Sequence, residues 1–246
     1  AVTVVGDNPA KGLPTVQGAM MVYAPDTGAL SAIIDSRLVT EIKTASDSTL
    51  GARLLARPDS KRLLIVGAGV VAESLIHAYT AIFPRLEHVL VWARRPEQAQ
   101  ALLKRMTGIK AKLSVAEDLA TTAASADIIS SATMARTPVL KGEWITPGTH
   151  VDLIGAFKAD MREADNALIS SGSLFVDSRD TTLHHIGELM IPLAAGIINE
   201  SDIKGDFYDL IARGASARKS GDEITVFKNG GGAHLDLMIA DYISGA

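Results

Sequence analysis

The chain has 246 residues, and a hydrophobic share of 47% is ample for the buried core of one large or two small domains. Its net charge of −4, with both signs interspersed, excludes the basic stripe that nucleic-acid binding requires. It contains no cysteine, which excludes disulfides and thiolate metal sites. No apolar run reaches the roughly 18 residues that span a bilayer, and the first residues lack the order of a signal peptide. We therefore expect a cytoplasmic protein with no nucleic-acid or membrane partner.

The first part of the chain predicts a small antiparallel sheet and one helix. Strands are expected at residues 2–5, 18–24 and 29–35, and a helix at residues 40–56 with Thr40 as its N-cap. Arg57, Pro58 and Asp59 then interrupt the helical pattern. We place a domain boundary there because a different alternation begins at the next residue.

From residue 58 onward strands and helices alternate, which is typical of a doubly wound parallel sheet of the α/β class. Strands are expected at residues 63–66, 88–92, 111–115, 127–131, 150–154, 174–176 and 224–227. Helices are expected at residues 70–83, 97–106, 116–124, 162–169, 181–190, 201–213 and 233–243. We expect a Rossmann domain over residues 58–221. A smaller α+β domain for substrate binding and dimerisation would combine residues 1–57 and 222–246, and its exposed sheet edges predict a homodimer.

A glycine-rich turn follows the strand at residues 63–66. Gly67, Gly69 and Ala72 have the spacing G-x-G-x-x-A, which is typical of a dinucleotide-binding turn. The helix that begins near Val70 would direct its free N–H groups at a pyrophosphate. The expected contacts come from Gly67, Ala68, Gly69, Val70 and Val71. A turn that only connects a strand to a helix is the alternative.

The end of the next strand indicates which nucleotide is bound. Ala93, Arg94 and Arg95 stand where an acidic residue would bind the ribose hydroxyls of NAD. Two guanidinium groups instead favour the 2′-phosphate of NADPH, with NADH as the alternative. The alternative is a pair of arginines in a turn that only contact solvent and bind no cofactor.

Three other loops are candidates by position alone. Thr133 and Gly155 follow the fourth and fifth strands and should point into the cofactor crevice, unless they are simple loop residues. Residues 230–232 are three glycines before a helix, which fits a second anion site and a hinge equally well.

Some charged clusters favour no catalytic role. His184 and His185 are adjacent, so on a helix their side chains diverge and cannot share a metal ion. We expect no metal site. The acidic and basic residues at 162–165 are better explained as a charged helix start than as an acid/base pair.

Several stretches together resemble the ornithine cyclodeaminase/mu-crystallin family. They are GDNPAKGLPTVQG, IKTASDSTLGARLLARPDS, IVGAGVVAESL, PVLKGEWITPGTHVDLIGAFKADMREAD, VDSRD with the following GEL, and DEITVFKNGGGAHLDLMIADYI. The resemblance covers nearly the whole chain and implies a nicotinamide cofactor and a homodimer. Members of this family carry a further segment before the stretch that matches Ala1, so we expect the chain to be truncated at its N-terminus.

The resemblance also implies site residues. The family's R-T-A-A helix start is here Lys43-Thr44-Ala45-Ser46, so Lys43 and Thr44 are expected at both the substrate carboxylate and the cofactor. An exposed helix lysine is the alternative. Asn229 stands where the family often has serine near the nicotinamide. For the proton donor, Asp47, a bound water and a substrate protonated by solvent remain open.

One departure from the family pattern separates its activities. Cyclodeaminases have an acid/base Asp two residues after the glycine that matches Gly155, and this chain has Phe157. Phenylalanine cannot shuttle a proton, but it suits a dry wall beside a cyclic imine. We therefore expect NADPH-dependent reduction of pyrroline-2-carboxylate to proline or of piperideine-2-carboxylate to pipecolate. The alternatives are an ornithine cyclodeaminase or amino acid dehydrogenase that uses NAD, and a mu-crystallin-like binding protein without turnover.

Overall fold

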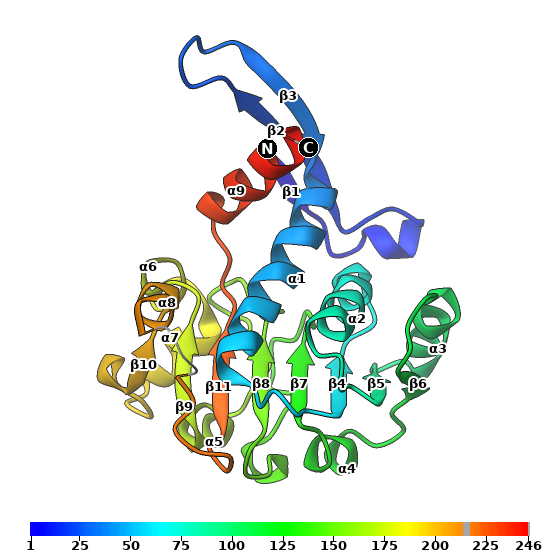
Figure 1. The fold of residues 1–246 in the computed structure, drawn as a ribbon, viewed down its shortest axis with the longest axis vertical. Coiled ribbons are helices and arrows are strands. Elements are labelled where there is room, and N and C mark those ends of the chain that lie inside the picture. Colours follow the sequence, from blue (N-terminus) through cyan, green and yellow to red (C-terminus); the bar gives the residue numbers. More distant parts are fainter. Residues whose placement is uncertain (214–216, 246) are drawn as a thin grey trace. The chain divides into compact units, whose positions relative to one another are not determined.

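The computed structural model describes residues 1–213 and 217–245. The chain forms two compact units, a smaller one of Ala1–Thr44 with Gly232–Ala246 and a larger one of Ala45–Gly231 (Figure 1). The boundary between the two units falls inside the helix α1 (Ser36–Leu55).

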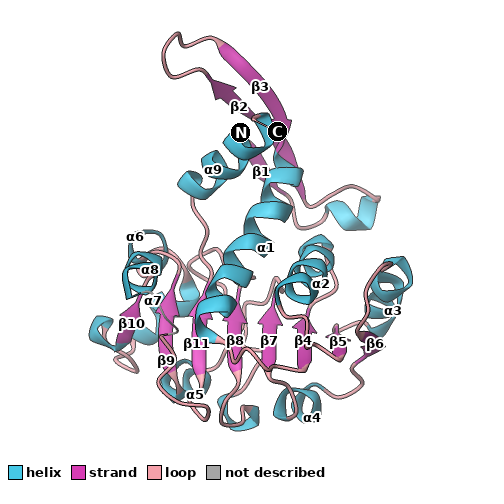
Figure 2. Ribbon diagram, in the orientation of Figure 1, coloured by secondary structure: helices cyan, strands magenta, loops and turns pink. Residues whose placement is uncertain are grey.

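The larger unit contains a parallel sheet of eight strands among the described residues (Figure 2). Their order is β10-β9-β11-β8-β7-β4-β5-β6, and every neighbouring pair runs parallel. The strands are β4 (Arg62–Val66), β5 (His88–Trp92), β6 (Lys112–Val115), β7 (Ile128–Ser131), β8 (His150–Leu153), β9 (Ser173–Val176), β10 (Ile203–Gly205) and β11 (Thr225–Lys228). The expected α/β fold is confirmed.

Helices cover both faces of this sheet, so its central strands are apolar on both sides. Leu63 and Ile65 of β4 pack with residues of α1, α2 (Val70–Ile82) and α3 (Pro96–Arg105). Leu64 and Val66 pack with α4 (Leu119–Ala124), α5 (Asn166–Ser171) and α7 (Gly187–Ala194). This alternation follows from the two-residue period of a strand.

The strand order reverses between β4 and β7. The chain proceeds from β4 through β5 to β6 and then returns to the other side of β4 as β7 and β8. In doubly wound sheets a ligand crevice forms at the carboxyl ends of the two strands where the order reverses. The turn after β4 and the loop after β7 are therefore the loops to inspect.

The smaller unit is a three-stranded antiparallel sheet covered by one helix. Its strands β1 (Val2–Val4), β2 (Val16–Tyr23) and β3 (Leu30–Asp35) are in the order β1-β2-β3. Met20, Val22 and Ile34 pack with Ile239, Ala240 and Ile243 of α9 (Ala233–Ser244). A short 3₁₀ helix, η1 (Asn8–Lys11), follows β1.

The helix α1 begins at Ser36, four residues before the expected N-cap Thr40. The Asp35 carboxylate accepts a hydrogen bond from the Arg37 N–H at 2.8 Å, and Thr40 lies inside the helix, where its hydroxyl donates to the Ser36 carbonyl. Thr40 as N-cap was therefore wrong. An acidic residue at the end of a strand supplied the cap because it lies one turn earlier.

The expected helix over residues 181–190 is interrupted. This segment forms two helices, α6 (Arg179–Thr182) and α7, and the residue before α7, Ile186, is extended. Gly187 is the first residue of α7. A Cβ there would lie 2.3 Å from the Ala159 carbonyl oxygen, so a larger residue does not fit at the start of this second helix. Similarly, residues 201–213 form η3 (Glu200–Asp202), the strand β10 and α8 (Phe207–Arg213) in place of one helix.

The compact units do not divide at the expected domain boundaries. β11 lies between β8 and β9, so residues 222–231 belong to the larger unit. The local pattern of residues 224–227 predicts a strand but not the sheet that this strand joins.

Among the described residues no helix is long and apolar enough to cross a membrane, and no group of at least three His, Cys, Asp or Glu side chains could hold a metal ion.

Candidate functional site

The turn after β4 has the geometry that close approach of a phosphate requires. Gly67 has a φ of 121°, and a Cβ there would lie 2.6 Å from the Ala132 carbonyl oxygen at the end of β7. Gly69 is the N-cap of α2, has no side-chain cap, and a Cβ there would meet no atom within 4 Å. A pyrophosphate therefore fits at this helix N-terminus.

The segment after β5 carries the expected arginine pair. Ala93 is buried, whereas Arg94 and Arg95 are exposed. Arg95 is the N-cap of α3, and neither guanidinium has an ion-pair partner in the described ranges 1–213 and 217–245. Both guanidinium groups can therefore bind an external anion.

The loops after β7 and β8 touch one another. A Cβ on Gly155 would lie 1.9 Å from the Thr133 carbonyl oxygen, so only glycine permits this contact. Both loops are bound by one buried carboxylate, Glu163. Its Oε1 accepts from the Ser131 hydroxyl, the Thr133 N–H and the Thr133 hydroxyl, each at 2.7 Å, and its Oε2 accepts from the Gly155 N–H at 2.5 Å.

This role of Glu163 differs from the one expected from its sequence. The expectation that residues 162–165 form a charged helix start holds only for Asp165, whose carboxylate caps α5 by accepting from the Leu168 N–H at 2.8 Å. Glu163 precedes that helix and is completely buried. Its partners Ser131 and Thr133 precede it by 32 and 30 residues, so no local pattern could have revealed this role.

A buried lysine follows at the carboxyl end of β11. The ammonium group of Lys228 donates to the carbonyl oxygens of Leu153 at 3.0 Å, Ile154 at 3.2 Å and Asn229 at 2.7 Å. Burial lowers the pKa of Lys228, and the carboxylates of Glu188 and Glu163 oppose that effect. Burial also raises the pKa of Glu188 to about 7.

Asn229 connects this edge to a polar network beneath it. The Asn229 amide donates to the Ser48 hydroxyl at 2.9 Å, and Ser48 donates to Asp152 at 3.1 Å. Asp152 also accepts from Tyr79 at 2.9 Å and Ser130 at 2.7 Å. Burial raises the pKa of Asp152 to about 6 although these hydroxyls oppose the shift.

The glycine segment after β11 has an internal anion. Asp177, at the end of β9, accepts from the N–H groups of Gly230 at 2.8 Å and Gly231 at 2.6 Å. Its other oxygen accepts from the Ser178 N–H and the Thr182 hydroxyl. Two of the three glycine amides are therefore already bound by a carboxylate of the chain itself.

The amino-acid sequence matches the ornithine cyclodeaminase/mu-crystallin family over residues 1–245. The chain belongs to this family.

Relatives within the family include reductases and a dehydrogenase. The chain is 65% identical to the Delta(1)-pyrroline-2-carboxylate reductase of Paracoccus denitrificans, over 98% of this chain and 77% of that protein. It superposes with a TM-score of 0.95 and 32% identity on Thermococcus litoralis Delta(1)-pyrroline-2-carboxylate reductase in complex with NADH and L-proline, covering 99% of this chain and 76% of that one. An archaeal alanine dehydrogenase dimer with bound NAD has a TM-score of 0.89 and 28% identity, over 99% and 75% of the two chains.

The residues that the family resemblance nominated lie in both units. In the smaller unit, the Lys43 ammonium lies 3.2 Å from the Asp236 carboxylate, and Thr44 follows it in α1. Asp47 belongs to the larger unit, one residue before Ser48. Phe157, also in the larger unit, is 38% exposed, and the Lys158 ammonium lies 5.4 Å from its ring centroid.

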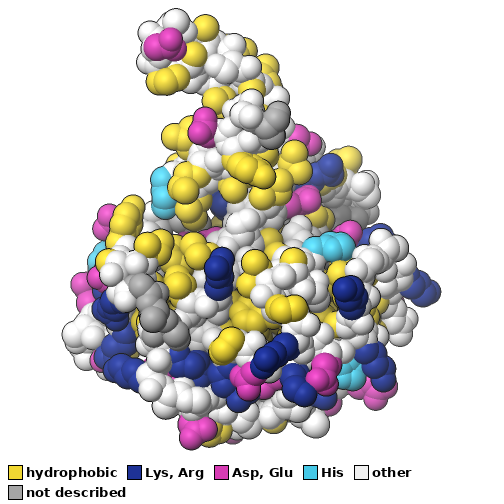
Figure 3. Space-filling view, in the orientation of Figure 1, with side chains coloured by type: hydrophobic (Ala, Val, Ile, Leu, Met, Phe, Trp, Pro, Cys, Tyr) yellow, Lys and Arg dark blue, Asp and Glu magenta, His cyan; other side chains and the backbone are white. Residues whose placement is uncertain are grey.

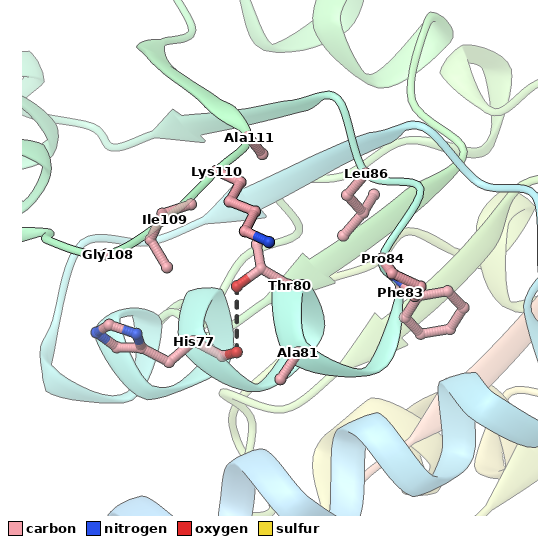
Figure 4. Close-up of a pocket in the computed structure, with 10 residues that line it drawn as sticks. All are labelled: His77, Thr80, Ala81, Phe83, Pro84, Leu86, Gly108, Ile109, Lys110 and Ala111. Atoms are coloured by element: carbon pink, nitrogen blue, oxygen red, sulfur yellow. Dashed lines mark hydrogen bonds between the residues drawn. The ribbon is translucent and has the colours of Figure 1, made fainter.

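The larger unit also contains a cavity of about 460 Å³. It is lined by the end of α2, by Phe83, Pro84 and Leu86, and by residues 108–111, as Figure 4 shows. These segments precede β5 and β6, so the cavity lies at the amino ends of the strands. It is therefore distinct from the carboxyl edge that carries the glycine turn.

Proposed function

We propose that the protein is an NAD(P)H-dependent reductase of cyclic imino acids, with pyrroline-2-carboxylate reduced to proline as the leading reaction and piperideine-2-carboxylate as the alternative substrate. The observation that carries this proposal is the 65% identity to a Delta(1)-pyrroline-2-carboxylate reductase over 98% of the chain. Phe157 supports it because that side chain cannot perform the proton transfers that cyclodeamination needs.

The carboxyl edge of the parallel sheet would bind the cofactor. The N–H groups at Ala68 to Val71 would bind the pyrophosphate, favoured by the positive end of the α2 dipole. Thr133, Gly155 and Asn229 would line the nicotinamide end. When bound, the cofactor supplies a hydride to the imine carbon.

The chain's own residues would orient the substrate and exclude water. Lys43, with Thr44 beside it, would bind the substrate carboxylate as a point charge in place of the family's arginine. Asp236 would hold the Lys43 ammonium ready for that role, because the two are already ion-paired. Phe157 would present an apolar side chain to the ring of a cyclic imine and exclude water from it. Asp47 is the proposed proton source within the chain.

We propose NADPH as the preferred cofactor. Arg94 and Arg95 support this preference because both are exposed and have no ion-pair partner in the described part of the chain. The end of β5, where NAD-binding folds carry an acidic residue, continues here into Ala93 and the two arginines. The two solved relatives described above contain NADH and NAD, so both nucleotides have to be compared on this chain.

Two assays on the purified protein test the reaction. NADPH oxidation with pyrroline-2-carboxylate is expected to be rapid, and ammonia release from ornithine with NAD is expected to be absent. Ammonia release alone would identify a cyclodeaminase. Cofactor binding with turnover in neither assay would identify a binding protein.

A further inference from the structure

The peptide bond between Ile154 and Gly155 is held by buried groups at both of its polar atoms. Its carbonyl oxygen accepts a hydrogen bond from the Lys228 ammonium at 3.2 Å. Its N–H donates to the Glu163 carboxylate at 2.5 Å. A cation and an anion thus act on opposite ends of one peptide dipole, which leaves it a single favourable orientation.

The same two side chains bind the neighbouring loops. Glu163 also binds the Thr133 N–H and hydroxyl after β7, and Lys228 also binds the carbonyl oxygens of Leu153 and Asn229. Glu163 is itself fixed, because the Glu188 carboxylate accepts from its N–H at 2.7 Å. All three ionisable side chains are fully buried.

The polar atoms of both side chains are occupied, those of Lys228 by backbone carbonyls and those of Glu163 by two N–H groups and two hydroxyls. Such groups do not exchange protons readily with a ligand, and ordinary core packing would not require charges here, because burying an ion pair is costly. The charges act on the ends of β7, β8 and β11, which meet at the carboxyl edge.

We propose that Glu163 and Lys228 are positioning residues that set the orientation of the Ile154–Gly155 peptide and the Thr133 loop for the nicotinamide half of the cofactor. This inference rests on the proposed function only in its assignment of these loops to the nicotinamide. The adenine half would bind at the glycine turn and the arginine pair, which neither side chain contacts.

The test uses Glu163→Gln in the full chain. Glutamine has the same shape, but its amide nitrogen is a donor. It would therefore face one of the N–H groups that now donate to the Glu163 carboxylate. Asp127→Asn is the matched control, because Asp127 accepts from the Lys61 N–H at 2.8 Å and the Arg62 N–H at 2.9 Å at the amino edge of the same sheet. Both variants lose one carboxylate that joins two segments.

We expect Glu163→Gln to bind 2′,5′-ADP, the adenine half of the cofactor, as the wild type does. Its affinity for NADPH should fall about ten-fold and its kcat by about ten-fold or more, since misplaced loops cost orientation in the reacting complex. Without any cofactor, hydrogen exchange at residues 131–135 and 154–157 should accelerate. Asp127→Asn should show none of these changes, although its melting temperature falls.

Two results would overturn the proposal. One is wild-type exchange, NADPH affinity and kcat in Glu163→Gln. The other is an equal loss of affinity for NADPH and 2′,5′-ADP together with a lower melting temperature, which would show general structural support. If the wild type has no reductase activity but the affinity split and the faster exchange appear, the positioning role stands and the proposed reaction fails.

The double variant Glu163→Gln/Lys228→Met checks that both charges act on the same peptide. It removes an anion and a cation together, so the net charge of the buried cluster stays the same, whereas each single variant changes it. If the two residues act on one peptide, the loss of kcat in the double variant should be clearly smaller than the product of the two single losses. Strictly multiplicative losses would contradict a shared target.

Discussion

At the scale of single residues, this chain combines exposed cations with ionisable groups that are buried and hydrogen-bonded within the protein. Arg94 and Arg95 belong to the first kind, and Glu163, Lys228 and Asp152 to the second. The exposed arginines can change partner at little cost, so they suit ligand selection. The buried groups suit positioning, because removing one partner leaves an uncompensated polar group.

Replacing both Arg94 and Arg95 by alanine is expected to weaken NADPH binding by roughly 10- to 100-fold, the loss of one or two charge-assisted hydrogen bonds to a phosphate. NADH binding should be nearly unchanged. Fluorescence titration of the reduced nicotinamide measures both. Arg85→Ala, an exposed arginine before the start of β5, is the control and should alter neither. Equal losses for the two nucleotides would refute 2′-phosphate recognition.

Asp152 is expected to make stability depend on pH. Its pKa is about 6 in the folded chain and 3.8 in the reference state, so the folded state binds the proton more tightly. The free energy of unfolding should therefore fall as the pH rises from 3.8 to 6 and stay lower above that range, by up to about 3 kcal/mol. Urea unfolding at pH 4 and pH 7 should show a smaller loss in Asp152→Asn than in the wild type. Part of the loss should remain in the variant, because the pKa of Glu188 is also raised, to about 7. An unchanged or larger pH dependence in the variant would contradict the assignment.

At the scale of elements, the strand, turn and helix from β4 to α2 separate two roles of glycine. Gly67 is required by the backbone, because its φ is 121° and the Ala132 carbonyl is close. Gly69 has an ordinary φ of −83° and open space around it. One glycine therefore supports the fold and the other leaves room for a ligand.

The two alanine variants should differ accordingly. Gly67→Ala is expected to lower the free energy of unfolding by about 1–3 kcal/mol through backbone strain and the contact with Ala132. Gly69→Ala should keep wild-type stability and lose cofactor affinity, because its methyl group enters the space for the pyrophosphate. Thermal unfolding and nucleotide titration on both variants measure the contrast. A destabilised Gly69→Ala that binds cofactor normally would show that this turn is only a connector.

At the scale of the whole molecule, the smaller unit has an apolar outer face. Met21, Tyr23 and Ile33 on β2 and β3 are 55%, 53% and 66% exposed, while their neighbours on the inner face pack against α9. Hydrophobic side chains are visible along this hairpin in Figure 3, whereas charges of both signs are spread over the larger unit. We propose that a second copy of the chain covers this face, because exposed apolar patches of this kind mark protein–protein contacts. The smaller unit would then serve dimerisation as well as substrate binding.

Ile33→Glu is expected to convert a homodimer into a monomer, because it places a charge in the apolar face. Sedimentation velocity on the wild type and the variant measures the mass directly. Tyr208→Glu, which adds the same charge at a residue 76% exposed in the larger unit, should leave the dimer intact. A monomeric wild type would contradict the proposal.

The local pattern of the sequence determined the α/β class, the glycine turn, the arginine pair and most strands, because each depends on residues a few positions apart. Only the tertiary structure decided that β11 lies between β8 and β9, that Asp177 binds the glycine amides, and that Glu163 and Lys228 hold one peptide. These features join residues far apart in the chain. Hydrogen bonds and strand neighbours at such separations are set by how the sheet assembles, and no short stretch records them.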